Sequence, residues 1–331
     1  MIFSEYREAI FKARSIPFKA TSSIMERQTV ALEMAVARLN LLISEATNSL
    51  GQVDAVLYRV KRDNILALLE TLAQNLSRDI HQGVLSVTEE TTSLISEVTT
   101  DLVEDEDQGD IRFSFVTIPE EVLNDYTKRT DIEGLKFSPN IWAKRQMRNI
   151  EKQVLSAIMR GQSATSLSKD LVQYLKGGSV GMGHSIRYKT LRLARTEINT
   201  AFHETRRLGA VTSPVVAGMR WRLSNRHPMW DVCDLLAQQD LYHMGKGVYP
   251  PEQLPPKPHP NCICYTMDQL RDPKEWQTQK PVSTIKESPS NFKVKDAKGT
   301  DRYVKKQYRI FTALLDRVVA DAKLETDVDP Q

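Results

Sequence analysis

The sequence predicts a predominantly α-helical α+β protein, in which long N-terminal helices precede a compact domain. Apolar residues recur every three or four positions through the first third of the chain, a spacing typical of amphipathic helices. Shorter patterns of the same kind follow residue 139, and near Met219 the period changes to two, which indicates a strand. A proline-rich segment comes next. We therefore expect about three helices, a small antiparallel sheet and a proline-rich loop in the second part.

Two helices are expected in the first third. The first should begin at a capping box, Ser23-Ile24-Met25-Glu26, and end at Gly51. The second should run from Val53 to Leu102 and end in an acidic turn. Helices of this length need partners for their apolar stripes. Two arrangements meet that need equally well: an antiparallel hairpin packed on the rest of the chain, or an arm that packs against other subunits.

The remaining patterns divide the chain into segments. The run Ile111–Ile118, closed by Pro119, predicts an edge strand. Three helical patterns follow, one from Ser138-Pro139-Asn140 to Gly161, one through Leu167 and Leu175, and one from Ser185. We expect an N-terminal helical region at 1–110, a strand and linker at 111–139, a compact domain at 140–270, and a basic linker with a C-terminal amphipathic helix at 271–331.

Composition limits the class of protein. With 40% hydrophobic and 26% charged residues among 331, the chain is typical of a soluble globular protein. It has no apolar run of the roughly 18 residues that a spanning helix needs, so no membrane partner is expected. Three cysteines, an odd number, favour a reducing compartment over a disulfide framework. The N-terminus lacks the apolar region of a secretory signal, so we expect folding in a cytoplasm.

The segment Asp231–Cys264 is the most unusual part of the sequence. It holds all three cysteines and a dense group of prolines, which favours an extended path over a helix. It ends in Cys262-Ile263-Cys264, whose spacing would place both sulfurs on one face of a strand over 262–267. We expect this strand to pair with the one that carries Met219, Trp221 and Leu223.

One interpretation of this segment is a zinc site formed by Cys233, His259, Cys262 and Cys264. Three thiolates and an imidazole would supply the tetrahedral set that structural zinc prefers. The spacings are unusual, since Leu236 occupies the position at which a Cys-x-x-Cys motif has its second thiol. The alternative is three small free thiols packed under the proline loop.

A metal-dependent nuclease would instead use His227, Asp231, Asp234, His259 and Asn261. Such a site needs a base for water and carboxylates for a divalent ion, but no pair of these residues has a diagnostic spacing. The alternative is structural: Asp231 and Asp234 cap a helical turn, while His259 and Asn261 hydrogen-bond the loop.

Two further groups of polar residues are candidates for binding. Arg195 and Glu197 lie two positions apart on a predicted helix, so they should reach separate partners, one of them anchoring the loop. The basic stretch 293–309 is a candidate for phosphate contact, or simply a solvated face on a flexible lead to a helix that carries Val304 and Val318. Its candidate DNA-contacting residues are Lys293, Lys295, Lys298, Arg302, Lys305 and Lys306.

Taken together, these motifs resemble the phage head morphogenesis domain of phage minor head proteins of the Mu F type. The resemblance covers residues 140–270 and rests on Ala194–Glu197, Trp221, Asp231–Asp234, Tyr249-Pro250 and Pro255–Cys264. The chain departs from the family at Ile263, often an arginine there, and in lacking the second cysteine of a Cys-x-x-Cys pair. The structural residues that the family motif assigns are Arg195, Glu197, Trp221, Asp231, Asp234, Pro256, Pro260 and Asn261.

The resemblance implies a structural role and no enzymatic activity. Members of the family associate with the portal vertex, take part in procapsid assembly and help to route DNA during packaging or ejection. Transferred to this chain, the partners are the portal protein, the major capsid or scaffold protein, and non-specifically bound DNA. The expected location is the capsid interior of a virion assembled in a bacterial cytoplasm. The alternatives are a metal-dependent nuclease and a zinc-binding interaction module.

Overall fold

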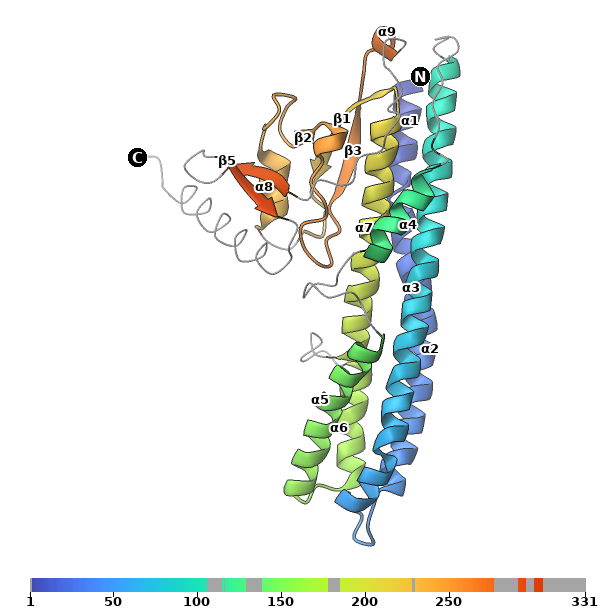
Figure 1. Cartoon of the computed structure of the whole chain (residues 1–331), viewed down its shortest axis with the longest axis vertical. Helices are drawn as coiled ribbons and strands as arrows, with labels where there is room; N and C mark the ends of the chain where they lie inside the picture. The colour runs from blue at the N-terminus through green and yellow to red at the C-terminus, as the bar shows by residue number, and fades with distance from the viewer. Residues whose placement is uncertain are drawn as a thin grey trace, which may run out of the picture. The chain divides into compact units, whose positions relative to one another are not determined.

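The computed structural model describes residues 2–105, 115, 117–128, 139–177, 185–227, 230–276, 291–295 and 301–305. The chain forms two units, each built from separate stretches of sequence. The helical unit comprises Ala20–Gly83 and Lys136–Ala194; the sheet unit comprises Met1–Lys19, Val84–Leu135 and Arg195–Gln331. The fold is a predominantly helical α+β structure with long N-terminal helices and a small antiparallel sheet, as predicted (Figure 1).

The N-terminal region contains helices α1 (Ile2–Lys12), α2 (Ser15–Glu45) and α3 (Ala55–Asp105). The prediction that a helix begins at Ser23 is wrong, because the Ser23–Glu26 motif lies inside α2. Pro17 falls in the first turn of α2, where a missing N–H removes no intrahelical hydrogen bond. Proline at that position therefore does not separate Ser15 from the rest of the helix.

The connection between α2 and α3 reverses the chain. α2 ends at Glu45 and not at the predicted Gly51, which occupies the turn with a φ of 72°. The Asp54 carboxylate then accepts hydrogen bonds from the amides of Val56 and Leu57 and caps α3. The result is a helical hairpin that packs within the helical unit. Whether it also contacts other subunits stays a prediction.

The strand predicted at 111–118 falls mostly outside the described residues. Its end is wrong, because Ile118 begins helix α4 (Ile118–Lys128) and Pro119 occupies the first turn of that helix. The next predicted helices are confirmed as α5 (Pro139–Met159), α6 (Ala164–Lys176) and α7 (Ile186–Thr212). Ser163 caps α6 at its N-terminus by accepting from the Ser166 amide, and Gly177 follows its last residue.

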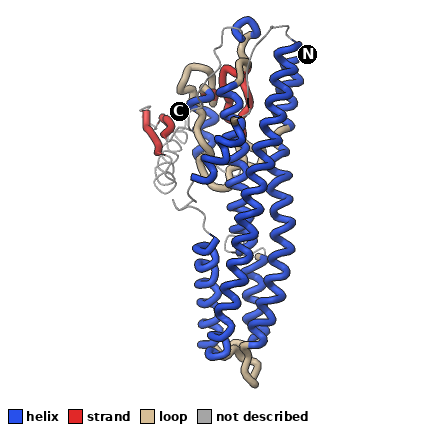
Figure 2. Tube along the Cα trace, turned by 45° about the vertical axis from the view of Figure 1, so that its right-hand side comes forward, coloured by secondary structure: helices blue, strands red, loops and turns tan. Residues whose placement is uncertain are grey.

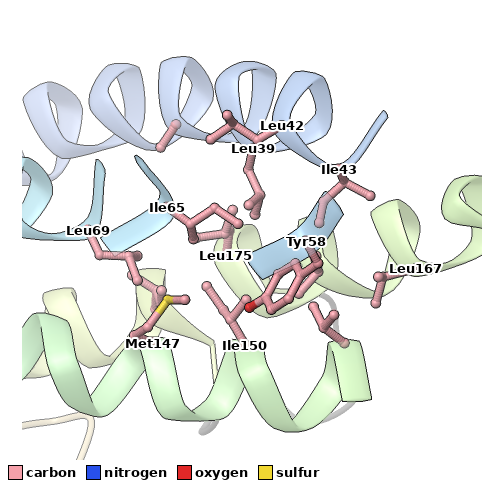
Figure 3. Packing of buried hydrophobic residues seen from close by; sticks show 14 of the residues in the cluster. Leu39, Leu42, Ile43, Tyr58, Ile65, Leu69, Met147, Ile150, Leu167 and Leu175 are labelled. Atoms are coloured by element: carbon pink, nitrogen blue, oxygen red, sulfur yellow. The ribbon is translucent and has the colours of Figure 1, made fainter. Parts of the chain in front are cut away.

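The core of the helical unit is built from the apolar faces of its helices. Leu39 and Ile43 from α2 and Ile65 and Leu69 from α3 are buried with Ile150 of α5 (Figure 3). The spacing of four residues within each pair is one of those that predicted these helices. In Figure 2 the helices dominate the described chain, and strand is confined to small regions. Among the described residues, no helix is long and apolar enough to cross a membrane.

The sheet unit is organised around three short antiparallel strands. They are β1 (Val216–Arg222), β2 (Val248–Tyr249) and β3 (Tyr265–Leu270), in the order β2-β1-β3. The predicted pairing of the Met219–Leu223 strand with the strand after the cysteines is thus confirmed. Helix α8 (Val232–Gln238), the 3-10 helix η2 (Pro251–Gln253) and the short helix α9 (Pro273–Trp276) complete the described part.

Two predictions near the C-terminus need correction. The strand expected over 262–267 begins only at Tyr265, because prolines precede the cysteines and Asn261 adopts a left-handed conformation with a φ of 64°. The basic lead, expected to be flexible, contains the paired strands β4 (Asn291–Lys295) and β5 (Asp301–Lys305). The predicted C-terminal helix is wrong at Val304, which lies in β5, and the rest of that helix falls outside the described residues.

A charged network is buried in the sheet unit. Arg206 of α7 donates to Asp268 of β3 at 2.6 Å, and both side chains are almost fully buried. The Tyr6 hydroxyl of α1 donates to the second carboxylate oxygen of Asp268 at 2.9 Å. One carboxylate thus joins a strand to two helices. Arg207 and Glu204 form a second buried pair one turn apart on α7.

Candidate metal centre

Helix α8 positions the first cysteine. Asp231 caps this helix by accepting from the Cys233 amide at 2.6 Å, and the Asp234 carboxylate accepts from the Asp231 amide in return. This reciprocal capping box fixes the first turn. Cys233, the second residue of the helix, is fully buried as a consequence.

The proline segment is held along its length by buried side chains. His203 of α7 hydrogen-bonds the Pro255 carbonyl at 2.8 Å, and its ring packs edge-on against Trp221. The Lys257 ammonium donates to the Cys264 carbonyl and lies 5.6 Å from the centre of the Trp221 ring. Because prolines donate no backbone hydrogen bonds, these side chains fix the path of the segment.

The turn before Cys262 is anchored to α7. Arg195 donates from Nη1 to the Asn261 side-chain oxygen at 2.9 Å, and the Asn261 amide donates to the Thr196 hydroxyl at 3.0 Å. These bonds hold Asn261 in the left-handed conformation, which asparagine adopts more readily than most residues. Arg195 therefore takes the loop-anchoring position expected from the sequence. Glu197 is half-buried on the same helix.

The three thiols are buried in the same core cluster of the sheet unit. The sulfurs of Cys233 and Cys262 are 3.6 Å apart, and Cys233 Sγ lies 3.3 Å from His259 Nε2. Tetrahedral zinc with bonds of about 2.3 Å to sulfur and about 2.0 Å to nitrogen places such atoms about 3.8 Å and about 3.6 Å apart. The observed separations differ from these by a few tenths of an ångström. Cys233, His259 and Cys262 thus form a group that could hold a metal ion.

The remaining cysteine faces a second histidine. Cys264, the fourth residue of the predicted zinc set, is not in that group; its sulfur lies 3.7 Å from Nδ1 of His227. The other ring nitrogen of His227, Nε2, is 2.8 Å from Asp234 Oδ2. A carboxylate on the far nitrogen of a histidine is the usual partner of a metal-binding imidazole. His227 was assigned from the sequence only to the nuclease alternative, and the structure brings it to the thiols.

His259 is held in the opposite orientation. Its Nδ1 lies 3.0 Å from the Pro260 carbonyl, while Nε2 faces both Cys233 Sγ and Asp231 Oδ2, the latter at 3.2 Å. Burial opposes a charge on the ring, but hydrogen bonds to Asp231 and Cys262 outweigh it and raise the pKa of His259 to about 10. Two acceptors therefore compete for the proton at one ring nitrogen, a position that a cation can also fill.

The thiols differ in acidity. Hydrogen bonds from Cys233 and Cys264 hold the pKa of the Cys262 thiol well below its usual value, and the positive charge of Lys257 acts in the same direction. The hydrogen bond to Cys262 raises the pKa of Cys233. Of the three thiols, Cys262 is therefore the one whose surroundings most favour the thiolate form. A bound cation would deprotonate all three.

The residues of the nuclease alternative also lie close together. His227, Asp231 and Asp234 place their polar atoms within 4.8 Å of one another. Each carboxylate is already engaged: Asp231 and Asp234 cap α8, and both accept from a histidine. Asn261 is held by Arg195 and Thr196. The structural roles expected for these residues are therefore observed in the geometry.

The other residues of the family motif take structural positions. Trp221 is buried in the sheet unit and Pro256 is buried in the proline segment, while Pro260 is half-buried beside Asn261. Four of the candidate DNA-contacting residues, Lys293, Lys295, Arg302 and Lys305, lie on β4 and β5. Lys298 and Lys306 fall outside the described residues.

Several residues that hold the segment were not identified from the sequence. His203 and Lys257 contact it directly. A spacing rule finds neither, since His203 is 52 residues from Pro255 along the chain. One signal was present for Lys257, which is the lone lysine among four closely spaced prolines.

Comparison of the chain with protein-family models, with curated proteins and with solved structures found no match. The resemblance to phage minor head proteins therefore rests on the motif residues alone.

Proposed function

We propose that the chain is a phage minor head protein that associates with the portal vertex and takes part in procapsid assembly and in DNA packaging or ejection. One observation carries the proposal beyond the sequence motif. The quoted motif residues lie far apart in the sequence, yet Arg195 meets Asn261 and Cys233 meets His259 and Cys262. We call this group of contacts the clasp. Its formation supports membership of a family that is defined by the same motif.

The engagement of these residues also favours a structural role. The histidines and carboxylates of the segment bond one another and the backbone. The polar groups thus hold the loop, and the partners would be the portal protein, the major capsid or scaffold protein, and DNA. A virion location at the portal vertex follows from the same proposal.

Co-expression with a portal protein tests the assembly role. The chain should co-purify with portal rings and with procapsids that contain them. A matched variant, Arg195→Ala, removes the anchor of the turn at Asn261 and should reduce recovery if the clasp shapes the docking surface. Recovery of portal rings and procapsids free of the chain would contradict the proposal.

We propose further that the clasp holds a structural zinc ion. Cys233, Cys262 and Cys264 would supply three ligands and His259 the fourth, with His227 able to take the fourth position through Nδ1. Three thiolates and one imidazole are the soft set that zinc accepts in closed structural sites. Asp234 or the Pro260 carbonyl would orient the imidazole from its far nitrogen.

Metal analysis of the purified protein tests this second proposal. We expect about one zinc per chain, lost in Cys262→Ser. His259→Ala and His227→Ala identify the fourth ligand, because only the variant of the true ligand should lower zinc affinity strongly. A protein purified without chelators that contains no zinc, and takes up none on titration, would falsify the zinc site. That result would leave the assembly role standing.

A nuclease remains the second candidate function, because His227, Asp231 and Asp234 do converge. Purified protein incubated with DNA and Mg²⁺ or Mn²⁺ should leave the DNA intact. Cleavage that disappears in Asp231→Asn or His259→Ala would establish the nuclease instead. An interaction module outside phages would hold the same zinc, and only the portal experiment separates it from the head protein.

A further inference from the structure

The sheet unit contains a cavity whose lining includes none of the cysteines. Its volume is about 600 Å³, within the range of roughly 300–1,000 Å³ typical of ligand sites. It is bordered by helix α1, by strands β1 and β3, by Ala237 of α8 and by Lys246. The residues that line it are Phe11, Arg220, Trp221, Arg222, Leu223, Ala237, Lys246, Tyr265 and Met267.

The register of the sheet places the two arginine side chains of β1 on the same face. Arg220 pairs with Met267, and Arg222 pairs with Tyr265, in an antiparallel ladder. Residues directly opposite one another share a face of the sheet, so these four side chains lie together. Trp221, which lies between them on β1, is buried. Arg220 and Arg222 are about 7 Å apart along the strand.

The lining is strongly cationic. It contains Arg220, Arg222 and Lys246 and no carboxylate. In the part of the chain that the structure describes, none of these three forms an ion pair. Arg14 adds a fourth charge at the border, because its guanidinium stacks 3.5 Å over the ring of Tyr265. Such a group of uncompensated charges attracts anions.

An aromatic side chain lies beside these charges. Phe11 lines the cavity and is 51% exposed, in contrast to Tyr6 and Ile10 of the same helix, which are buried. Its ring contacts Arg14 and meets Tyr265 edge-on. An exposed aromatic ring adjoining cations is the combination with which proteins bind single strands, because bases stack on the ring while phosphates meet the cations. An acidic peptide would use the cations and gain little from the ring.

We propose that this cavity binds a segment of single-stranded nucleic acid, with phosphates on Arg220, Arg222 and Lys246 and a base stacked on Phe11. The proposal does not depend on the head-assembly role. It also differs from the basic strands β4 and β5, since it uses other residues and adds a stacking platform.

Fluorescence anisotropy of a labelled oligothymidylate of about twelve nucleotides, a length suited to single-strand sites, tests the proposal. Arg222→Glu should weaken binding at least about tenfold and lower the slope of log affinity against log salt by about 0.7 or more. The matched control is Arg59→Glu on α3, an exposed arginine in the helical unit with the same change of charge. It should bind as the unchanged protein does.

Phe11→Ala tests the stacking directly. We expect affinity to fall about five- to a hundredfold, the range that loss of one base–aromatic stack produces. Phe18→Ala, which removes another exposed phenylalanine of the sheet unit that does not line the cavity, should leave affinity unchanged. Circular dichroism establishes that all four variants fold.

Three results would overturn the proposal. The unchanged protein fails to bind the oligonucleotide at low salt, or Arg222→Glu and Arg59→Glu weaken binding equally, which makes the attraction a property of net charge. The third is complete displacement of the oligonucleotide by polyglutamate together with no effect of Phe11→Ala, which assigns the cavity to an acidic peptide.

Discussion

The two units bury different kinds of side chain. The helical unit buries mainly Leu, Ile, Val and Ala from repeating helix faces, as around Leu39, Ile65 and Ile150 (Figure 3). The sheet unit buries an Arg206–Asp268 pair, a neutral His203 and three thiols together with its apolar residues. Apolar burial is non-directional and tolerates small changes, whereas a buried polar group is costly once its partner is lost. In the helical unit, the loss of stability on substitution should therefore vary with the amount of buried side chain removed. In the sheet unit, the loss of a single polar partner should already lower stability strongly.

Removal of metal should produce the largest difference in stability between the two units. If zinc holds the clasp, chelation or Cys262→Ser should lower the stability of the sheet unit by several kcal/mol, because zinc binding and folding are coupled. Hydrogen exchange measures the effect peptide by peptide. Residues 248–270 should lose at least about a hundredfold in protection, about 3 kcal/mol, while α5 and α6 should keep theirs. An equal loss in both units would mean that metal does not stabilise the sheet unit selectively.

The next largest effect is expected at the buried ion pair. Asp268→Asn leaves Arg206 without its charged partner at a site where both side chains are almost fully buried. Breaking such a pair costs about 3–5 kcal/mol. Urea unfolding followed by tryptophan fluorescence in a Trp142→Phe background reports on the sheet unit, which contains the other three tryptophans. The control Asp101→Asn, an exposed carboxylate, should change stability by less than about 0.5 kcal/mol.

Truncation of a buried apolar side chain tests how the stability of the helical unit depends on its core. Ile150 is fully buried on α5, so Ile150→Ala should cost about 2–5 kcal/mol through lost burial and a cavity. Leu155→Ala on the same helix removes a side chain that is 56% exposed and should cost much less. Thermal unfolding followed by far-ultraviolet circular dichroism compares them. Similar losses for the two would show that α5 does not pack as described.

Of the four tests, a change of one pH unit should have the smallest effect. Burial lowers the pKa of His203 to about 3 from an ordinary value near 6.5, so the folded protein keeps the ring neutral. Between these values the unfolded chain binds a proton that the folded chain does not, so stability falls as pH decreases below about 6.5. The slope is about 1.4 kcal/mol per pH unit.

His203→Gln removes this titration and keeps a donor for the Pro255 carbonyl. The variant should show a shallower loss of stability than the unchanged protein between about pH 6 and pH 4, measured by urea unfolding at each pH. Parallel curves for the two proteins would mean that His203 is protonated in the folded state.

Periodicity predicted the elements that are held by apolar packing. The helices containing Ile150, Leu171 and Ile198 and the strand containing Trp221 were found because each repeats its buried residues at a fixed interval. Boundaries failed where local chemistry decides them. Ser23 resembles a cap but lies mid-helix, and Gly51 resembles a helix end but lies in the turn that follows Glu45.

The candidate site was predictable only in part, for a related reason. Cysteines and a histidine crowded into Asp231–Cys264 indicate a cluster by composition alone, and the structure brings Cys233, His259 and Cys262 together. The contact of Cys264 with His227 spans 37 residues, and that of Arg195 with Asn261 spans 66. Such pairs depend on how the sheet and α7 fold, which no local pattern in one sequence specifies.

The hydrogen bond between Tyr6 and Asp268 has a consequence for the order of folding during synthesis. The two residues are 262 positions apart, so at roughly 5–20 residues per second the ribosome needs roughly 13–50 s to make the second after the first. The helical unit is complete in sequence at Ala194, well before Asp268 is made. Until β3 emerges, Tyr6 of helix α1 lacks its Asp268 partner. The sheet unit, late to close, is thus the part of the nascent chain most dependent on protection by chaperones.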